Sequence, residues 1–300
     1  MTNMLISIII RTFNEEEYLN ELLSSIKTQK CDNYKTEVVI VDSGSTDKTI
    51  EIATQNSARI TYIDKNQFTY GKSLNIGCEF ANGDIFVFIS GHCIPTSDSW
   101  LKSLIKPIIQ GDCDYVYGRQ VGKDKTKFSE HRIFEKYFPN HSSIPQVGFF
   151  CNNANSAIAK NTFEQYQFNE VLTGLEDLYL AQQIHNNNGR VGYVAESIVY
   201  HMHNETWFQI KIRYERESIA LQKIMPEIKI SLFDMLFFIT AGVLKDIHIA
   251  FKSKVVLKET KSIVMFRIMQ YYGSYRGNHL TRKLSYRAKM RYFYPRIYKN

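Results

Sequence analysis

LISIIIRTFNEE, residues 5–16, is the stretch that decides the fold class. Its first half, residues 5–10, is an almost continuous run of apolar, β-branched side chains, which is typical of a strand buried on both faces of a parallel sheet. Asn14 and Glu17 supply the polar groups that commonly begin a helix. Apolar residues then recur at helical spacing between Tyr18 and Ile26. The stretch therefore predicts a strand that leads directly into a helix.

The same strand-helix unit recurs along the first part of the chain. Further strands are expected at 37–41, 60–63 and 85–89, with helices after a polar turn at 42–47 and at 71–81. This alternation continues to about residue 120. It predicts a Rossmann-like α/β domain with an open, mostly parallel sheet and helices on both faces.

Polar residues follow three of these predicted strands. They are the segments Arg11–Asn14, Asp42–Ser45 and Ser90–Cys93. Ligands of open α/β sheets bind beyond the carboxyl ends of the strands. We therefore expect the three segments to share one rim of the sheet and to form a binding site there.

The pattern changes after residue 120. Residues 120–200 are less regular, with a helix expected at 175–185, and from Trp207 the pattern is helical. We therefore expect an α/β domain at residues 1–205 and a helical region at 206–300.

Composition and targeting signals narrow the class of protein. The 300 residues are 44% hydrophobic and 22% charged, which is typical of a globular chain. Five single cysteines form no C-x-x-C pair, so we expect reduced thiols rather than a disulfide framework or a zinc cage. No secretory signal is seen at the start, and a cytoplasmic protein is expected.

The basic character of the chain is concentrated at its C-terminal end. The net charge is +7, and residues 258–300 contain eleven basic side chains and one acidic side chain. An apolar run at 235–244 is shorter than the ~20 residues that a spanning helix needs. Short apolar helices before a basic, aromatic-rich segment favour peripheral contact with a membrane surface. A helical subdomain with a solvated basic face is the alternative, and nucleic acid is disfavoured because no known nucleic-acid module accompanies the charge.

Two motifs identify a family. SIIIRTFNE at 7–15 and VIVDSGSTD at 39–47 resemble the paired opening motifs of family 2 glycosyltransferases with the GT-A fold. The resemblance extends over about residues 4–215, and further matches point to bacterial rhamnosyltransferase-like members that build surface polysaccharides. These matches are GKSLNIG at 71–77, YGRQ at 117–120, NANSA at 153–157, LED at 175–177 and YH at 200–201.

The resemblance implies a reaction and its substrates. Family members of this kind move a sugar, with inversion, from a nucleoside diphosphate donor to a growing surface glycan. A polyprenyl-linked glycan acceptor at the inner face of the membrane is expected here, because it would explain the basic, aromatic C-terminal segment. The nucleotide-site candidates implied by the resemblance are Thr12, Asn14, Glu15, Asp42 and Lys72. In the family an acidic residue at the position of Asp42 reads the pyrimidine. The alternative for Asp42 is a turn or helix-cap aspartate.

The catalytic candidates are an acidic pair. Asp177 matches the base position of the family, and Glu176 is the adjacent supporting acid. The helix dipole at this helix start favours an ionised carboxylate, although both residues could serve only to complement the helix N-terminus. The sugar or acceptor candidates are Arg119, Gln120, Asn153 and Asn155.

The chain departs from the family at the metal site. Most relatives carry a D-x-D motif that holds Mn²⁺ or Mg²⁺ against the diphosphate, but the stretch here reads Ser90-Gly91-His92. The resemblance places His201 where many GT-A enzymes supply a downstream histidine, so Ser90, His92 and His201 are the metal or diphosphate candidates. Imidazole serves Mn²⁺ better than Mg²⁺, which prefers oxygen.

Alternatives exist for the metal and for the function. Lys72, Arg119 or Arg213 could balance the diphosphate directly, and His92 could be a packed structural residue. A sugar nucleotidyltransferase is disfavoured because residues 11–16 lack the glycine-rich loop of those enzymes. The missing carboxylates motivate a degenerate scaffold or glycan-binding protein, against which the retained Glu176-Asp177 pair argues.

Overall fold

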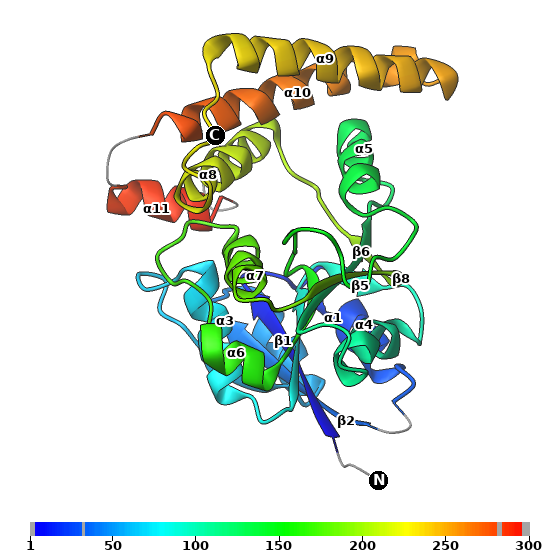
Figure 1. Ribbon diagram of the computed structural model, residues 1–300, viewed down its shortest axis with the longest axis vertical. Helices are drawn as coiled ribbons and strands as arrows, with labels where there is room; N and C mark the ends of the chain where they lie inside the picture. The colour runs from blue at the N-terminus through cyan, green and yellow to red at the C-terminus, as the bar shows by residue number, and fades with distance from the viewer. Residues whose placement is uncertain (1–3, 32–33, 281–283, 296–300) are drawn as a thin grey trace. The chain divides into compact units, whose positions relative to one another are not determined.

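The computed structural model describes residues 4–31, 34–280 and 284–295, and the chain divides into two compact units (Figure 1). The first unit comprises Met1–Lys123, Tyr137–Val171 and Glu176–Met202. The second comprises Asp124–Lys136, Leu172–Leu175 and His203–Asn300.

The first unit is built on a mixed sheet, which is eight-stranded in the described part of the chain, in the order β3-β2-β1-β4-β7-β6-β8-β5. The strands are β1 (Met4–Thr12), β2 (Tyr34–Asp42), β3 (Arg59–Tyr62), β4 (Ile85–Ser90), β5 (Cys93–Pro95), β6 (Tyr115–Val121), β7 (Asn155–Ala159) and β8 (Val191–His201). The half formed by β3, β2, β1 and β4 is parallel, as predicted. The short strands β5 and β7 pair antiparallel with their neighbours.

Strand direction explains why distant residues meet. β7 is antiparallel to both β4 and β6, and β6 is parallel to β8, so β6 and β8 run in the direction of β1. The carboxyl ends of β1, β2, β4, β6 and β8 therefore lie along one edge of the sheet, which we call the rim. Because β7 runs the other way, its beginning at Asn155 also lies at the rim.

Helices cover both faces of this sheet. They are α1 (Leu19–Lys27), α2 (Thr49–Gln55), α3 (Tyr70–Phe80), α4 (Trp100–Ile109), α6 (Lys160–Tyr166) and α7 (Glu176–Asn186). Ile8 and Ile10 of β1 belong to the same buried cluster as Leu22 of α1 and Trp100 of α4, whereas Ile9 faces α3 at Gly77. Burial on both faces is what the apolar run predicted, and each such side chain contributes about 1.5–3 kcal/mol.

The predicted start of the first helix was wrong. The helix begins at Leu19, and Asn14 lies outside it with φ 54°, a left-handed conformation that asparagine tolerates better than most residues. The Asn14 side chain accepts a hydrogen bond from the Thr46 N–H at 2.8 Å, and its own N–H donates to the Ser45 hydroxyl at 2.9 Å. Asn14 therefore joins the turns that follow β1 and β2 instead of capping a helix.

The second unit is helical, as predicted. It contains α8 (Trp207–Ile224), α9 (Leu232–Lys252), α10 (Val256–Asn278), α11 (Tyr286–Phe293) and nearly all of α5 (Phe128–Tyr137). α10 packs against both α8 and α9. Among the described residues, no helix combines the length and apolar character needed to cross a bilayer. Four of the basic residues counted near the C-terminus lie outside the described residues: Arg282, Lys283, Arg296 and Lys299.

The contact of α3 with the sheet yields a stability prediction. A Cβ added at Gly77 would lie 2.6 Å from the Ile9 methyl and 2.9 Å from the Val41 methyl. We expect Gly77→Ala to lower the free energy of unfolding by about 1–3 kcal/mol, because overpacking outweighs the better helix propensity of alanine. Urea unfolding measures the change, and Glu79→Ala on the exposed side of α3 is the control. An unchanged or raised stability for Gly77→Ala would contradict this packing.

Candidate active site

The carboxylate of Asp42 organises the turn after β2. Its Oδ2 accepts the N–H groups of Gly44 and Ser45, both at 2.8 Å, and its Oδ1 accepts the hydroxyls of Thr12 at 2.9 Å and Ser45 at 2.5 Å. Asp42 is 1% exposed. A carboxylate has about four acceptor positions, and all four are used. These contacts are those of the turn aspartate considered as the alternative role of Asp42. A nucleotide base could hydrogen-bond to this carboxylate only by displacing one of the hydroxyls.

The other nucleotide candidates are dispersed along the rim. The hydroxyl of Thr12 donates to Asp42, and the Asn14 side chain accepts a hydrogen bond from the turn at 45–46. Lys72, in the first turn of α3, donates to the side-chain carbonyl of Gln67 at 3.1 Å. The Lys65 ammonium lies 4.6 Å from the centre of the Phe13 ring, which gives an aromatic face and a cation at the end of β1. Neither Phe13 nor Lys65 was singled out in the sequence analysis, because their pairing depends on the fold.

Glu15 contacts His92 rather than open solvent. The carboxylate Oε1 of Glu15 lies 3.1 Å from Nδ1 of His92, and Glu15 is 8% exposed. A Cβ added at Gly91 would lie 2.9 Å from Cγ of Glu15, so only glycine leaves room for this approach. An ionised carboxylate only accepts, and it therefore holds a proton on Nδ1 of His92.

Gln120 and Asn152 fix the tautomer of His201. The backbone N–H of Ala154 donates to Oδ1 of Asn152 at 3.0 Å, which settles the orientation of that amide. Nε2 of Gln120 donates to the same Oδ1 at 2.9 Å, so the Gln120 carbonyl oxygen faces His201, 2.7 Å from Nδ1. A carbonyl oxygen only accepts, and Nδ1 of His201 must therefore donate. The lone pair of the neutral imidazole then lies on Nε2.

The imidazoles of His92 and His201 have the arrangement of two histidines that could ligate one metal ion. The ring centres of His92 and His201 are 5.2 Å apart, and each ring offers a ligand nitrogen within 4.8 Å of the other. In both, Nδ1 is held by an oxygen acceptor, the arrangement that orients metal-ligating histidines through their other nitrogen. Ser90 ends β4, with its side chain beside the Cys93 thiol. These residues fit a divalent cation that prefers nitrogen ligands.

The acidic pair opens α7 at the rim. Glu176 is 5% exposed, and its carboxylate lies 3.1 Å from the Arg11 guanidinium. Asp177 is 7% exposed and accepts the N–H groups of Asn153 and Leu178, both at 2.8 Å. Burial, together with the charge of Glu176, raises the pKa of Asp177 to about 7, against the opposing effects of these N–H groups and of Arg11. The carboxylate is therefore poised to exchange a proton near neutral pH.

The two asparagines predicted for sugar or acceptor recognition differ. The Asn155 side chain is 0% exposed and is fully used, because it accepts from the Trp100 indole and donates to the carbonyls of Arg119 and Ser197. The prediction that Asn155 recognises a hydroxyl was therefore wrong, and its role is structural. Asn153 is 3% exposed, and its buried Nδ2 has no hydrogen-bond partner among the described residues, which is unusual for a buried donor.

The three cations proposed as diphosphate partners are also distinguished. Arg213, in the second unit, already contacts Glu130 at 2.5 Å and Glu205 at 2.7 Å. His203 of the same unit also lies against Glu130, with its Nδ1 2.6 Å away. Arg119 retains a buried Nε with no partner in the described part of the chain, and Lys72 donates to the neutral side chain of Gln67. Of the three cations, Arg213 alone is described in ion pairs with carboxylates of the second unit.

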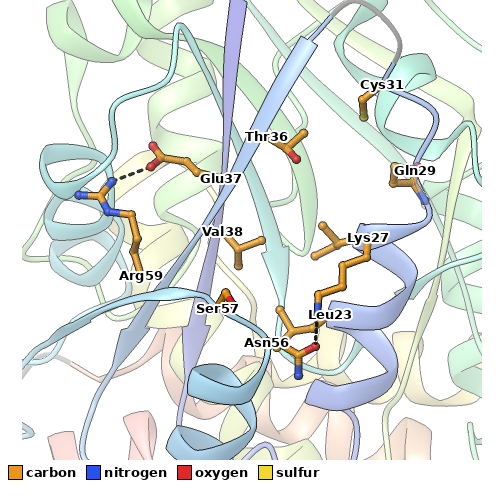
Figure 2. A pocket seen from close by; sticks show the side chains of 11 residues that line it. Leu23, Lys27, Gln29, Cys31, Thr36, Glu37, Val38, Asn56, Ser57 and Arg59 are labelled. Atoms are coloured by element: carbon orange, nitrogen blue, oxygen red, sulfur yellow. Dashed lines mark hydrogen bonds and ion pairs between the residues drawn. The ribbon is translucent and has the colours of Figure 1, made fainter.

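A separate cavity lies away from this site. Its volume is ≈ 350 Å³, and it lies between α1 and the beginning of β2. Figure 2 shows residues that line it, among them Lys27, Glu37 and Arg59. Its charged groups are satisfied internally, with Glu37 2.6 Å from Arg59 and Lys27 2.8 Å from the Asn56 carbonyl oxygen. Glu37 lies in the first half of β2, whereas the rim begins at Asp42, so the cavity does not belong to the candidate site.

Comparison with known proteins identifies the class. A sequence profile described as "Glycosyl transferase family 2" matches residues 7–166. The O-antigen chain rhamnosyltransferase RfbN of Salmonella typhimurium is 27% identical over 219 residues, covering 68% of each chain. The O-antigen chain rhamnosyltransferase WbaN of Salmonella anatum is 28% identical over 197 residues, covering 62% of each chain.

A solved structure supports the fold. Mannosyltransferase PcManGT from Pyrobaculum calidifontis, determined in complex with GDP-Man and Mn²⁺, superposes with a TM-score of 0.63 at 16% identity, covering 98% of this chain and 88% of that one. The predicted GT-A fold is confirmed. Because the family profile spans more than half of the sequence, the chain belongs to glycosyltransferase family 2, and it is similar to enzymes of surface polysaccharide synthesis.

The hydrogen-bond chain at His201 yields a spectroscopic prediction. We expect the neutral imidazole of His201 to carry its proton on Nδ1, because the Gln120 oxygen can only accept. Nitrogen-15 NMR of the histidine side chains distinguishes the two tautomers. In Gln120→Leu, which removes the acceptor, we expect this preference to be lost, whereas Gln110→Leu at an exposed position leaves it unchanged. A wild-type His201 protonated on Nε2 alone would contradict this arrangement.

Proposed function

We propose that this chain is an inverting glycosyltransferase that moves a hexose or deoxyhexose from a nucleoside diphosphate donor to a surface-glycan acceptor. The observation that carries the proposal is the buried Asp177 carboxylate at the rim, whose pKa is raised to about 7. A general base is most effective when its pKa lies near the working pH. The rhamnosyltransferase relatives support a deoxyhexose such as rhamnose.

Asp177 is the proposed base. It takes the proton of the acceptor hydroxyl as that oxygen attacks the anomeric carbon, and the bond from that carbon to the diphosphate breaks on the opposite side. Attack from the far side inverts the configuration at the anomeric carbon. The neighbouring Glu176 is a positioning residue, because its charge raises the pKa of Asp177 and its ion pair with Arg11 ties α7 to β1.

His92 and His201 are the proposed holders of a divalent cation, with Ser90 beside them. When bound, such a cation neutralises the negative charge that develops on the leaving diphosphate. The imidazole pair favours Mn²⁺ over Mg²⁺. Glu15, first predicted to contact the nucleotide, instead orients His92, and Gln120, first predicted to contact sugar or acceptor, orients His201.

The donor and acceptor are proposed to occupy the remaining rim groups. The Phe13 ring with Lys65 offers a face for the base, beside the turn that Thr12, Asn14 and Asp42 hold. Lys72 and Arg119 balance phosphate charge. The Nδ2 of Asn153, which has no partner among the described residues, donates to a sugar or acceptor hydroxyl. We further propose a polyprenyl-linked acceptor at the cytoplasmic face of the membrane, with no nucleic-acid partner.

A degenerate scaffold or glycan-binding protein is the second candidate. The observation that favours it is the loss of both D-x-D carboxylates at Ser90 and His92. Hydrolysis of donor in the absence of acceptor separates the two functions, because a scaffold shows none. We expect slow hydrolysis by the wild type and its loss in Asp177→Asn.

The pH dependence of transfer tests the role of Asp177. The base acts when ionised, so the rate should rise with pH through an apparent pKa near 7 and then level off. Glu176→Gln removes the like charge that raises this pKa, and the midpoint should therefore move to lower pH. Asp177→Asn should reduce kcat by about 10²–10⁴-fold.

Glu164→Gln is the matched control, since its carboxylate is exposed on α6 and should leave the profile unchanged. If the midpoint of the pH–rate profile were the same in Glu176→Gln as in the wild type, Asp177 would not be the base. A near wild-type rate in Asp177→Asn would lead to the same conclusion.

A further inference from the structure

Helix α9 has apolar residues on two opposite faces. Met235 and Ala250 are buried on one face, which packs against α10 (Figure 1). The other face exposes Phe233 by 83%, Phe237 by 67%, Leu244 by 64% and Phe251 by 71%. Packing of an amphipathic helix against its neighbour explains the apolar residues on the buried face. It does not explain those on the exposed face.

The exposed side chains form one continuous stripe. Phe233 and Phe251 are separated by 18 residues, which is about five helical turns, so both point in the same direction. Phe237 and Leu244 lie between them at spacings that keep them on the same side of the helix. The apolar stripe therefore extends roughly 27 Å along the helix. Single exposed apolar residues are common, but a contiguous stripe marks an interaction surface.

The stripe is held in place by the packing of α9. Ser231 and Asp234 form a reciprocal capping box at its start. Asp246 is buried and accepts two hydrogen bonds from the Arg267 guanidinium of α10, at 2.8 and 3.0 Å. These contacts fix the rotation of α9 about its axis, so the exposure of the stripe is a property of the folded unit.

Exposed lysines are concentrated in the chain from the C-terminal end of α9 into α10. They are Lys245, Lys252, Lys254, Lys258 and Lys261. The acidic residues between Lys245 and Lys261 are Asp246, which is hydrogen-bonded to Arg267, and Glu259. Leu257, 97% exposed, lies among these lysines in the first turn of α10. The surface therefore combines an apolar stripe with a net positive charge.

We propose that the apolar stripe of α9 docks in the interface of a membrane that contains anionic lipids, with these lysines on the head groups. A helix that lies in the bilayer plane buries its apolar face at the acyl boundary and gains from cations near anionic head groups. A second copy of this chain would bring a like-charged lysine cluster to the contact, which favours lipid as the occupant. The proposal deepens the proposed function, on which it rests for the membrane-linked acceptor, by naming the surface that holds the enzyme there.

Vesicle flotation of the full chain tests the proposal. The probes are phosphatidylcholine vesicles with and without phosphatidylglycerol. We expect binding to the phosphatidylglycerol vesicles, and a loss of at least about tenfold in the variant Phe233→Ser, Phe237→Ser, Leu244→Ser, Phe251→Ser. The matched control is Tyr62→Ser, Val147→Ser, Val171→Ser, which removes exposed apolar side chains of the first unit and should bind as the wild type does. Circular dichroism checks that both variants fold.

A second variant tests the lysines. Lys252→Gln, Lys254→Gln, Lys258→Gln should lose the preference for phosphatidylglycerol and the sensitivity of binding to salt. Equal binding of the stripe variant and the wild type would overturn the proposal. The proposal would also be overturned if the wild-type protein did not bind vesicles but sedimented as a dimer, and if the stripe substitutions dissociated that dimer. A second copy of the chain would then cover the stripe.

The same proteins separate this proposal from the transferase function. Donor hydrolysis in solution does not involve α9 and should be equal in the stripe variant and the wild type. Vesicle binding without any donor hydrolysis would contradict the transferase function alone, and hydrolysis without vesicle binding would contradict the docking surface alone.

Discussion

The candidate site depends on the direction in which the strands run. β1, β2, β4, β6 and β8 all end at one edge of the sheet, and the antiparallel strands β5 and β7 begin there. This brings together polar groups that are as far apart in the chain as Arg11 and Glu176, which lie 3.1 Å from each other. If β7 ran parallel to β4, its first residues would lie at the opposite edge, and Asn153 could not bond Asp177. The topology thus supplies the geometry, and the side chains supply the chemistry.

Of the two D-x-D carboxylate positions, one is taken by Ser90 and the other by the imidazole of His92, and this changes what the surrounding residues must do. A carboxylate ligand is charged and symmetric, whereas a histidine ligates through one nitrogen only, and its other nitrogen must be held. Glu15 and Gln120 do this for His92 and His201, and the backbone N–H of Ala154 fixes the orientation of Gln120 through Asn152. The same protein keeps the acidic pair that opens α7. A transferase whose diphosphate site has shifted from oxygen to nitrogen ligands is consistent with both observations.

Sequence alone predicted the features that depend on local pattern or on motif. The buried run at 5–10 indicated a strand covered on both faces, and the polar segments after the predicted strands placed Asp42 at the rim. The family motifs singled out Asp177 and His201 without locating them on the sheet. Sequence alone missed features that depend on tertiary contacts. The hydrogen-bond partners of Gln120 and Asn155 lie far from them in the chain. No local signal shows that the Gln120 amide orients His201 while the Asn155 amide has all its hydrogen bonds within the protein. In α9 the apolar composition was visible, but only the packing against α10 shows which face remains uncovered.

Calorimetric titration with a panel of UDP-, dTDP-, GDP- and CMP-sugars, each with and without Mn²⁺, tests most directly whether the imidazole pair serves a transferase. Tight binding of one donor by the wild type, lost without Mn²⁺ and lost again in His92→Ala, is the result expected. Donor binding that is indifferent to both Mn²⁺ and His92 would move the diphosphate to Lys72 and Arg119. Failure to bind any donor would contradict the transferase function itself.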